Sequence, residues 1–315
     1  MTTYHRFKSR AAFTLVELLV AITIIAILAG FLTPAVFRAL SGAREAAIVI
    51  EMRQLDLAIE QFENDFGFYP PSFESGFNAA GNPVGISSAA DLRRFVNRIS
   101  PNNAEWTLDP TSTTQMRLER WWDEVGMFLD SESSLVFWLS GICKNKQFPI
   151  TGGESMSLAA HSFGSDPVER DIRFEFKTAQ VVFDPSNNLI ARYEQAHGVT
   201  DGDKFFRYRD AATYDIGGDA ASTVGDAYRA GDPSGSESVA PYQFANPNSF
   251  QLVSPGMDGL SGAPGNVNAV TAGVVQRASD GGSNVDFTGF HGADNICNFA
   301  EGRLERFVFE NQLVE

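Results

Sequence analysis

The chain has 315 residues, 43% of them hydrophobic, and its 39 acidic side chains against 24 basic ones give a net charge of -15 at pH 7. An acidic chain lacks the positive surface that nucleic-acid binding requires, so no nucleic-acid partner is expected. Two cysteines, Cys143 and Cys297, exclude a disulfide scaffold and leave room for one bridge at most.

The N-terminus combines a basic leader with a long apolar stretch. Residues 1–12 carry Arg6, Lys8 and Arg10, and residues 13–37 contain a single charge, Glu17. Twenty-five helical residues are long enough to cross a hydrocarbon core of about 30 Å. The charge bias predicts a single-pass membrane protein, with residues 1–12 cytoplasmic and the rest of the chain across the membrane.

The alternatives for this stretch are a signal peptide and a plain anchor in the lipid. The apolar segment is longer than the roughly 7–15 residues of a signal-peptide core. A carboxylate such as Glu17 in a spanning helix costs free energy that a plain anchor has no reason to bear. Its presence therefore indicates a function beyond anchoring.

The segment Ala12-Phe13-Thr14-Leu15-Val16-Glu17 resembles the prepilin cleavage motif of the type IV pilins and the type II secretion pseudopilins. The resemblance implies cleavage between Ala12 and Phe13 by prepilin peptidase and methylation of the new N-terminus. The family usually has glycine where Ala12 stands. Pro34 matches the position at which the family commonly carries a helix-bending proline.

The resemblance also implies how the helix is used. The chain would lie in the inner (cytoplasmic) membrane, with its C-terminal domain periplasmic or extracellular. Other pilin or pseudopilin subunits and the inner-membrane assembly platform would be its partners. In a filament, Glu17 of one subunit would pair with the α-ammonium group of Phe13 of the next, so that neither charge is buried alone. The alternative is that Glu17 simply lies at the level of the lipid headgroups.

Residues 38–66 are predicted to continue the helix as an amphipathic segment, which gives about 80 Å of helix from Phe13 onward. Its apolar residues recur every three or four positions. They are Ile48, Met52, Leu55, Ile59, Phe62 and Phe66. The polar residues between them are predicted to face outward: Glu51, Arg53, Gln54, Asp56, Glu60 and Glu63. Gly67 and Pro70-Pro71 are typical of a helix end.

Residues 67–315 are predicted to form a globular domain of α+β class, similar to pilins, in which the long helix packs on an antiparallel β-sheet with a large inserted middle region. Short helices are predicted at 91–99 and 131–139, a loop at 76–90, and the four tryptophans are expected in the core rather than in an exposed ligand patch. Alternation predicts strands at 172–183, 189–193, 205–208, 250–254 and 303–309. Long loops are predicted at 211–241 and 261–292.

The C-terminal region resembles the calcium-binding loop of the major pseudopilin, where a strand ending in Ser-x-Gly-x-Asp-Gly precedes a Gly-rich loop and an Ala-Asp-x-x-Asn segment. By this resemblance Asp258 and Asp294 would supply carboxylate oxygens to calcium, and the carbonyl groups near Leu252 and Ser254 would complete the shell. The connection here is much longer than in that family. The alternative is an ordinary Asp-Gly turn.

No known catalytic motif occurs in the sequence, so an enzyme is not expected. The resemblance favours a structural subunit of a type II secretion or type IV pilus-like filament. The alternative within the same family is a minor tip or adhesin-like pilin whose middle region binds a ligand or surface. A membrane-tethered enzyme would need neither Glu17 nor cleavage at Phe13.

Overall fold

The computed structural model describes residues 14–73, 75–77, 83–153, 168–185, 187–197, 204–214, 229–231, 243–244, 246, 248–257, 269–271, 274–276, 296–300 and 302–303. The chain divides into two compact units, Met1–Ala46 and Ala47–Glu315. The expected α+β architecture is confirmed, because one long N-terminal helix accompanies a set of small, mostly antiparallel sheets.

Helix α1 comprises Leu15–Phe66 and ends as the sequence predicts. Gly67 adopts φ +72°, a left-handed conformation that glycine tolerates best, and its N–H donates to the Glu63 carbonyl at 2.6 Å. Arg98 then donates to the Gly67 carbonyl at 2.6 Å, while its guanidinium lies 4.3 Å from the centre of the Phe68 ring. This cation stabilises the negative end of the helix.

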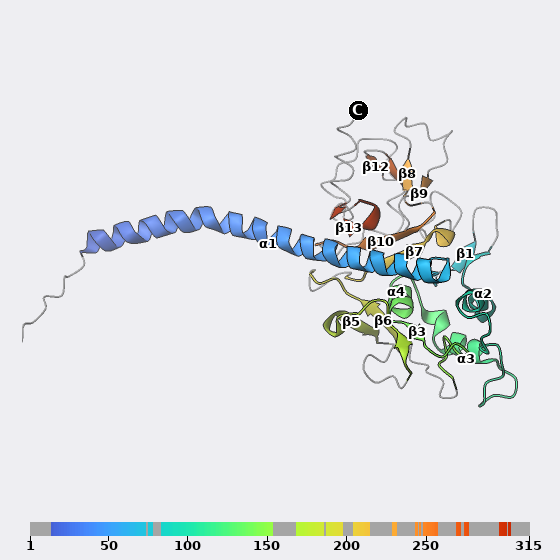
Figure 1. Ribbon diagram of the computed structural model, residues 1–315. Helices are drawn as coiled ribbons and strands as arrows, with labels where there is room; N and C mark the ends of the chain where they lie inside the picture. The colour runs from blue at the N-terminus through green and yellow to red at the C-terminus, as the bar shows by residue number, and fades with distance from the viewer. Residues whose placement is uncertain are drawn as a thin grey trace, which may run out of the picture. The chain divides into compact units, whose positions relative to one another are not determined.

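The second half of α1 is one layer of the domain core. Ile48, Met52, Leu55 and Ile59 are buried against the sheet β14-β13-β10-β7. The strands of that sheet are β7 (Arg207–Asp210), β10 (Phe250–Ser254), β13 (Ile296–Cys297) and β14 (Gly302–Arg303), all antiparallel to their neighbours. Figure 1 shows this sheet on one side of α1 and the elements α4 (Ser134–Leu139) and β6 (Asn187–Tyr193) on the other.

The prediction that Glu51 faces outward is wrong. Glu51 is only 2% exposed, because its carboxylate is the centre of a hydrogen-bonded cluster. It accepts from Tyr193 Oη at 2.7 Å and from Lys177 Nζ at 2.8 Å. Gln180 Nε2 and the Ala196 N–H donate to it as well. The helical period cannot reveal this burial, because the donors come from residues more than 120 positions away.

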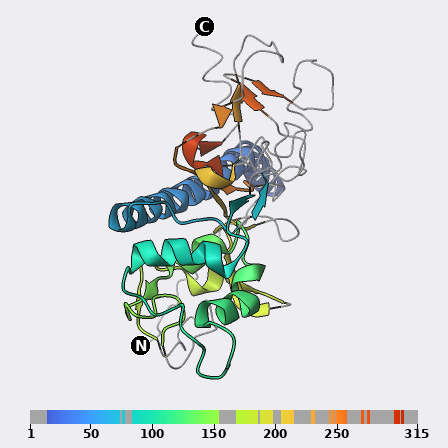
Figure 2. The same ribbon diagram turned by 90° about the vertical axis from the view of Figure 1, so that its right-hand side faces the viewer.

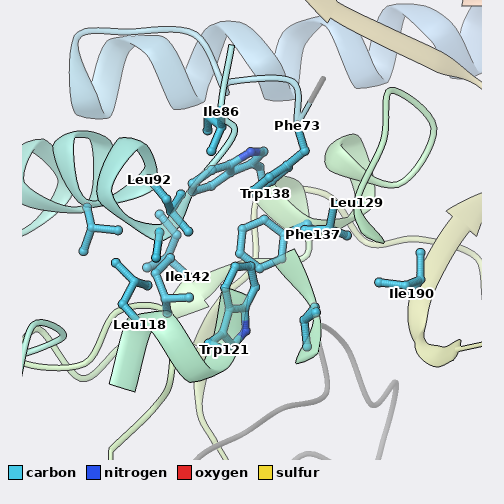
Figure 3. Close-up of a cluster of buried hydrophobic side chains, with 14 of the residues drawn as sticks. Phe73, Ile86, Leu92, Leu118, Trp121, Leu129, Phe137, Trp138, Ile142 and Ile190 are labelled. Atoms are coloured by element: carbon cyan, nitrogen blue, oxygen red, sulfur yellow. The ribbon is translucent and has the colours of Figure 1, made fainter. Parts of the chain in front are cut away.

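A second core holds most of the tryptophan, as expected. It lies among α2 (Ala89–Ile99), α3 (Arg117–Glu124), η1 (Gly126–Phe128) and α4. Trp121 and Trp138 are buried, and Phe73 stacks on Trp138 with ring centres 5.7 Å apart. Figure 3 shows the two indoles on either side of Phe137. In Figure 2 the teal and green helices lie together on one side of α1, and red β13 lies on the other.

The strand predicted over 172–183 is largely wrong. Only its last three residues lie in a strand, β5 (Val181–Asp184), which pairs with β6. Before it come β4 (Arg170–Asp171), paired with β3 (Ile142–Cys143), and the short helix η2 (Thr178–Gln180). The residues between cross the end of α4, because the N–H groups of Arg173 and Phe174 both donate to the Leu139 carbonyl. Over most of this segment the alternating residues have no partner strand, and the chain bends at Arg173 and Phe174 before η2 begins.

Most of the remaining short strands lie at least partly in the predicted loops 76–90, 211–241 and 261–292. β1 (Ser75–Phe77) and β2 (Pro83–Gly85) form a hairpin, and β8 (Arg229–Gly231), β9 (Gln243–Phe244), β11 (Ala269–Thr271) and β12 (Val274–Gln276) form a separate sheet in which β8 and β11 are parallel. The strand predicted at 250–254 is confirmed. The structure completes the element list with η3 (Ala211–Thr213) and η5 (Asn298–Ala300).

Candidate assembly site at the start of helix α1

The first turn of α1 is closed by a capping box between Thr14 and Glu17. Glu17 Oε2 accepts from the Thr14 N–H and from Thr14 Oγ1, both at 2.9 Å. Thr14 Oγ1 accepts from the Glu17 N–H at 3.2 Å in return. These bonds satisfy backbone donors that a helix start leaves without partners. Within the described residues, Glu17 Oε1 has no hydrogen-bond donor, so it remains available to a cation.

Thr14 is a residue that the sequence reasoning missed as a part of this site. Thr-x-x-Glu before an apolar run is the sequence signature of a capping box, so Thr14-Leu15-Val16-Glu17 carries a readable signal. Glu17 can cap the helix and pair with a cation at the same time, because the cap uses Oε2 and leaves Oε1 available. The cleavage residues Ala12 and Phe13 lie outside the described residues.

The apolar half of α1 is exposed along its whole length. Leu15, Phe31 and Phe37 are 78%, 77% and 66% exposed. Among the described residues, α1 is the single helix whose length and apolar composition suffice to cross a membrane. So much apolar surface needs a covering of lipid or of other helices.

Pro34 lies inside the helix and does not end it. A proline has no N–H, so the carbonyl of Gly30, four residues earlier, loses its usual donor. Two threonines of the same stretch turn their hydroxyl groups back onto the helix, Thr23 to the Leu19 carbonyl and Thr33 to the Ala29 carbonyl, each at 2.7 Å. Their polar atoms are therefore satisfied within the helix, as a lipid-facing surface requires.

The region predicted to bind calcium is only partly within the described residues. Leu252 and Ser254 are fully buried in β10, and Asp258 and Asp294 lie outside the described residues. Ser254 Oγ is already hydrogen-bonded to Gln195 Oε1. The pairing of Ser254 with Ile296 brings the end of β10 and the start of β13 to the same edge of the sheet. In the described part of the chain, no group of three His, Cys, Asp or Glu side chains has a metal-binding arrangement.

Comparison with known proteins adds one match. Residues 7–33 match the model of the prokaryotic N-terminal methylation motif. Comparisons with curated proteins and with solved structures find no match. The matched segment contains Ala12, Phe13 and the Thr14–Glu17 cap. The chain therefore carries a prokaryotic N-terminal methylation motif at the start of an exposed apolar helix, as a type IV pilin-like protein processed by prepilin peptidase does.

Proposed function

We propose that this protein is a structural subunit of a filament of the type II secretion or type IV pilus class, anchored by α1 in the inner membrane before assembly. The observation that carries the proposal is the combination of the methylation motif with the exposed helix and its capped carboxylate. A membrane anchor alone accounts for the apolar surface but not for the methylation motif at residues 7–33.

Cleavage between Ala12 and Phe13 would place a methylated α-ammonium group one residue before the capping box. In a bundle of such helices, Glu17 Oε2 stays on the Thr14 cap and Oε1 accepts the ammonium group of a neighbouring subunit. Each buried charge then has a partner of opposite sign. This arrangement explains why the carboxylate stands four residues after the proposed N-terminus, at the end of the helix that carries the cation.

The experiment is mass spectrometry of the N-terminal peptide from native membranes. We expect a chain that begins at N-methylated Phe13. The matched control is Ala12→Leu, which puts a bulky residue before the cut and should retain the leader. A native chain that still begins at Met1, or that is cut beyond Pro34, would contradict the proposal.

A minor, tip-located subunit is the second candidate, and the size of the domain favours it. One hydrophobic core fills the space between α1 and the sheet β14-β13-β10-β7. The second, aromatic core around Trp121 and Phe137 is formed by elements that this helix–sheet packing does not need. Sheared filaments separate the two roles, because a major subunit is abundant along the fibre and a tip subunit is present in a few copies.

We also propose that the edge of the sheet where β10 ends and β13 begins holds calcium. The antiparallel pairing places Ser254 opposite Ile296. In the sequence, Asp258 lies four residues after Ser254 and Asp294 lies two residues before Ile296. Carboxylate and carbonyl oxygens are suitable calcium ligands.

A further inference from the structure

Helix α2 has a basic outer face on a strongly acidic chain. Its exposed side chains include Arg93, Arg94 and Arg98, and Asp91 is the single acidic residue of the helix. The chain as a whole has a net charge of -15. A positive face attracts anions from solution, but arginines are common on protein surfaces. The geometry around these side chains decides whether they form a binding site.

Beside α2 lies a hollow of about 340 Å³, within the size range of small-molecule pockets, which is roughly 300–1,000 Å³. Helix α2 lines it with Arg94, Phe95 and Arg98. The rest of the lining includes Ile86, just after β2, and Asp210 at the end of β7. The hollow therefore combines two guanidinium groups, apolar surface and one carboxylate.

Both guanidinium groups are held in place through one nitrogen each. Arg94 Nη2 donates to Asp91 Oδ1 at 2.8 Å, and Arg98 Nη2 donates to the Gly67 carbonyl at 2.6 Å. The Arg98 guanidinium also lies 4.3 Å from the centre of the Phe68 ring. In the described part of the chain, the Nε and Nη1 groups of both arginines have no acceptor. Donors that are already positioned and still unused are suited to a planar oxyanion.

The charges around the hollow favour an anion with a single charge. Asp91 offsets part of the charge of Arg94, and Asp210 adds a carboxylate to the lining. A phosphate dianion would bring more negative charge than the two guanidinium groups can balance. A carboxylate fits the planar fork of an arginine. The Phe95 ring and Ile86 offer apolar surface to the remainder of such a ligand.

We propose that the hollow lined by α2 and the β7–η3 junction binds a small monocarboxylate that carries a ring. The carboxylate accepts hydrogen bonds from Arg94 and Arg98, and the ring covers Phe95 and Ile86. Sugar acids and aromatic acids share this chemistry. The inference goes beyond the filament function and does not depend on it, because the hollow belongs to the folded domain and lies outside the methylation motif.

The first test is titration calorimetry of the full-length chain in detergent micelles at pH 7.5. The probes are sodium glucuronate, sodium benzoate, inorganic phosphate and, as a neutral ring, glucose. We expect one carboxylate bound per chain, and the tighter of the two acids shows whether the ring is a sugar or an aromatic one. Glucose should not bind, and phosphate should bind more weakly. No binding of either carboxylate at millimolar concentration, or phosphate binding of equal strength, would overturn the proposal.

The second test uses two arginine variants of the same helix. Arg94→Gln should weaken carboxylate binding about tenfold, the effect of losing one charge-assisted hydrogen bond. The Arg94 side chain is 70% exposed, so the fold should not change. The matched control is Arg93→Gln, because Arg93 lies 4.6 Å from the centre of the Trp106 ring and does not line the hollow. It should keep the native affinity. Equal losses in both variants, or no loss in Arg94→Gln, would contradict a site in the hollow.

The third test uses the carboxyl group of Asp210. Burial raises the pKa of Asp210 to about 6, so this group is mostly protonated at pH 5 and mostly ionised at pH 7.5. Arginine stays charged and tyrosine stays neutral over this range. The other charged or titratable groups near the hollow are Arg94 with its partner Asp91, Arg98, Arg209, Tyr208 and Tyr214.

Loss of the negative charge on Asp210 favours an anionic ligand, so carboxylate affinity should be several-fold higher at pH 5 than at pH 7.5. Asp210→Asn should bind the carboxylate equally at both pH values, because it cannot titrate. Equal affinity of the native chain at the two pH values would contradict a ligand beside Asp210. Mass spectrometry of the N-terminus tests the filament function separately, so either proposal can fail while the other stands.

Discussion

Three carboxylates show how the partners of a side chain determine its role. Glu17 is exposed and closes the start of α1 through Thr14. Glu51 is buried in the same helix and joins it to the residues around β5 and β6. Asp210 is buried at the end of β7, where it accepts the Ser72 and Ala212 N–H groups at 2.7 and 2.8 Å. Glu51 and Asp210 have structural roles, which can be tested by measuring the free energy of unfolding of variants.

Replacing Glu51 by leucine should destabilise the domain by about 2–4 kcal/mol, because Tyr193 Oη and the Gln180 amide lose a buried acceptor. Lys177 is mostly exposed, so its ammonium group stays hydrated. Urea unfolding, followed through the buried tryptophans, measures the change. The matched control is Glu60→Leu on the exposed face of the same helix, which should change the free energy of unfolding by less than about 0.5 kcal/mol. Equal effects of the two changes would show that the cluster contributes little.

Asp210 should make stability fall as the pH rises. Burial raises the pKa of Asp210 to about 6 from 3.8, although the N–H groups of Ser72 and Ala212 favour the ionised form. Because the folded state holds this proton more tightly than the unfolded chain does, the contribution is fully present below pH 4. It is lost as the pH rises to about 6, and the shift corresponds to about 3 kcal/mol.

The measurement is the free energy of unfolding at pH 4 and at pH 6.5, in the native chain and in Asp210→Asn. The variant cannot titrate, so its difference between the two pH values should lack the fall assigned to Asp210. Glu175→Gln, an exposed carboxylate, should keep the native profile. A profile of Asp210→Asn that matches the native one would refute the assignment.

At the scale of elements, the sequence predicts best where the signal is local. The period of residues 48–66, the stop at Gly67 and the strand at 250–254 all depend on neighbours in the chain, and the structure confirms them. The alternation of residues 172–183 is equally clear but fails, because strand pairing depends on which segment lies alongside. There, Arg173 packs 4.6 Å from the centre of the Phe66 ring and pairs with Asp65 instead.

The candidate site shows the same difference between local signals, which the sequence reveals, and long-range contacts, which it does not. The Thr14–Glu17 cap is a four-residue motif and is readable from the sequence. The exposure of Ile50 (57%) and Leu57 (64%) cannot be read from the sequence. One amphipathic stripe indicates which face of α1 is buried, but it does not exclude apolar residues from the opposite face. The burial of Glu51 depends on donors from distant segments, and no pattern within α1 predicts it.

At the scale of the whole molecule, calcium should raise the melting temperature of the folded domain. Binding to the folded state alone stabilises it by about 2.7 kcal/mol when free calcium is a hundred times the dissociation constant. Melting curves with calcium and with a chelator measure the shift, which should disappear in Asp258→Ala and in Asp294→Ala. Identical curves in both conditions would leave Asp258-Gly259 as an ordinary turn.

The two thiols give this protein a built-in reporter of local opening. Cys143 in β3 and Cys297 in β13 are buried in different sheets, and neither forms a disulfide. Burial raises the pKa of the Cys297 thiol above its usual value. A thiol reagent can therefore react only when the surrounding strand opens. The labelling rate at each cysteine therefore reads the opening free energy of its own sheet under native conditions.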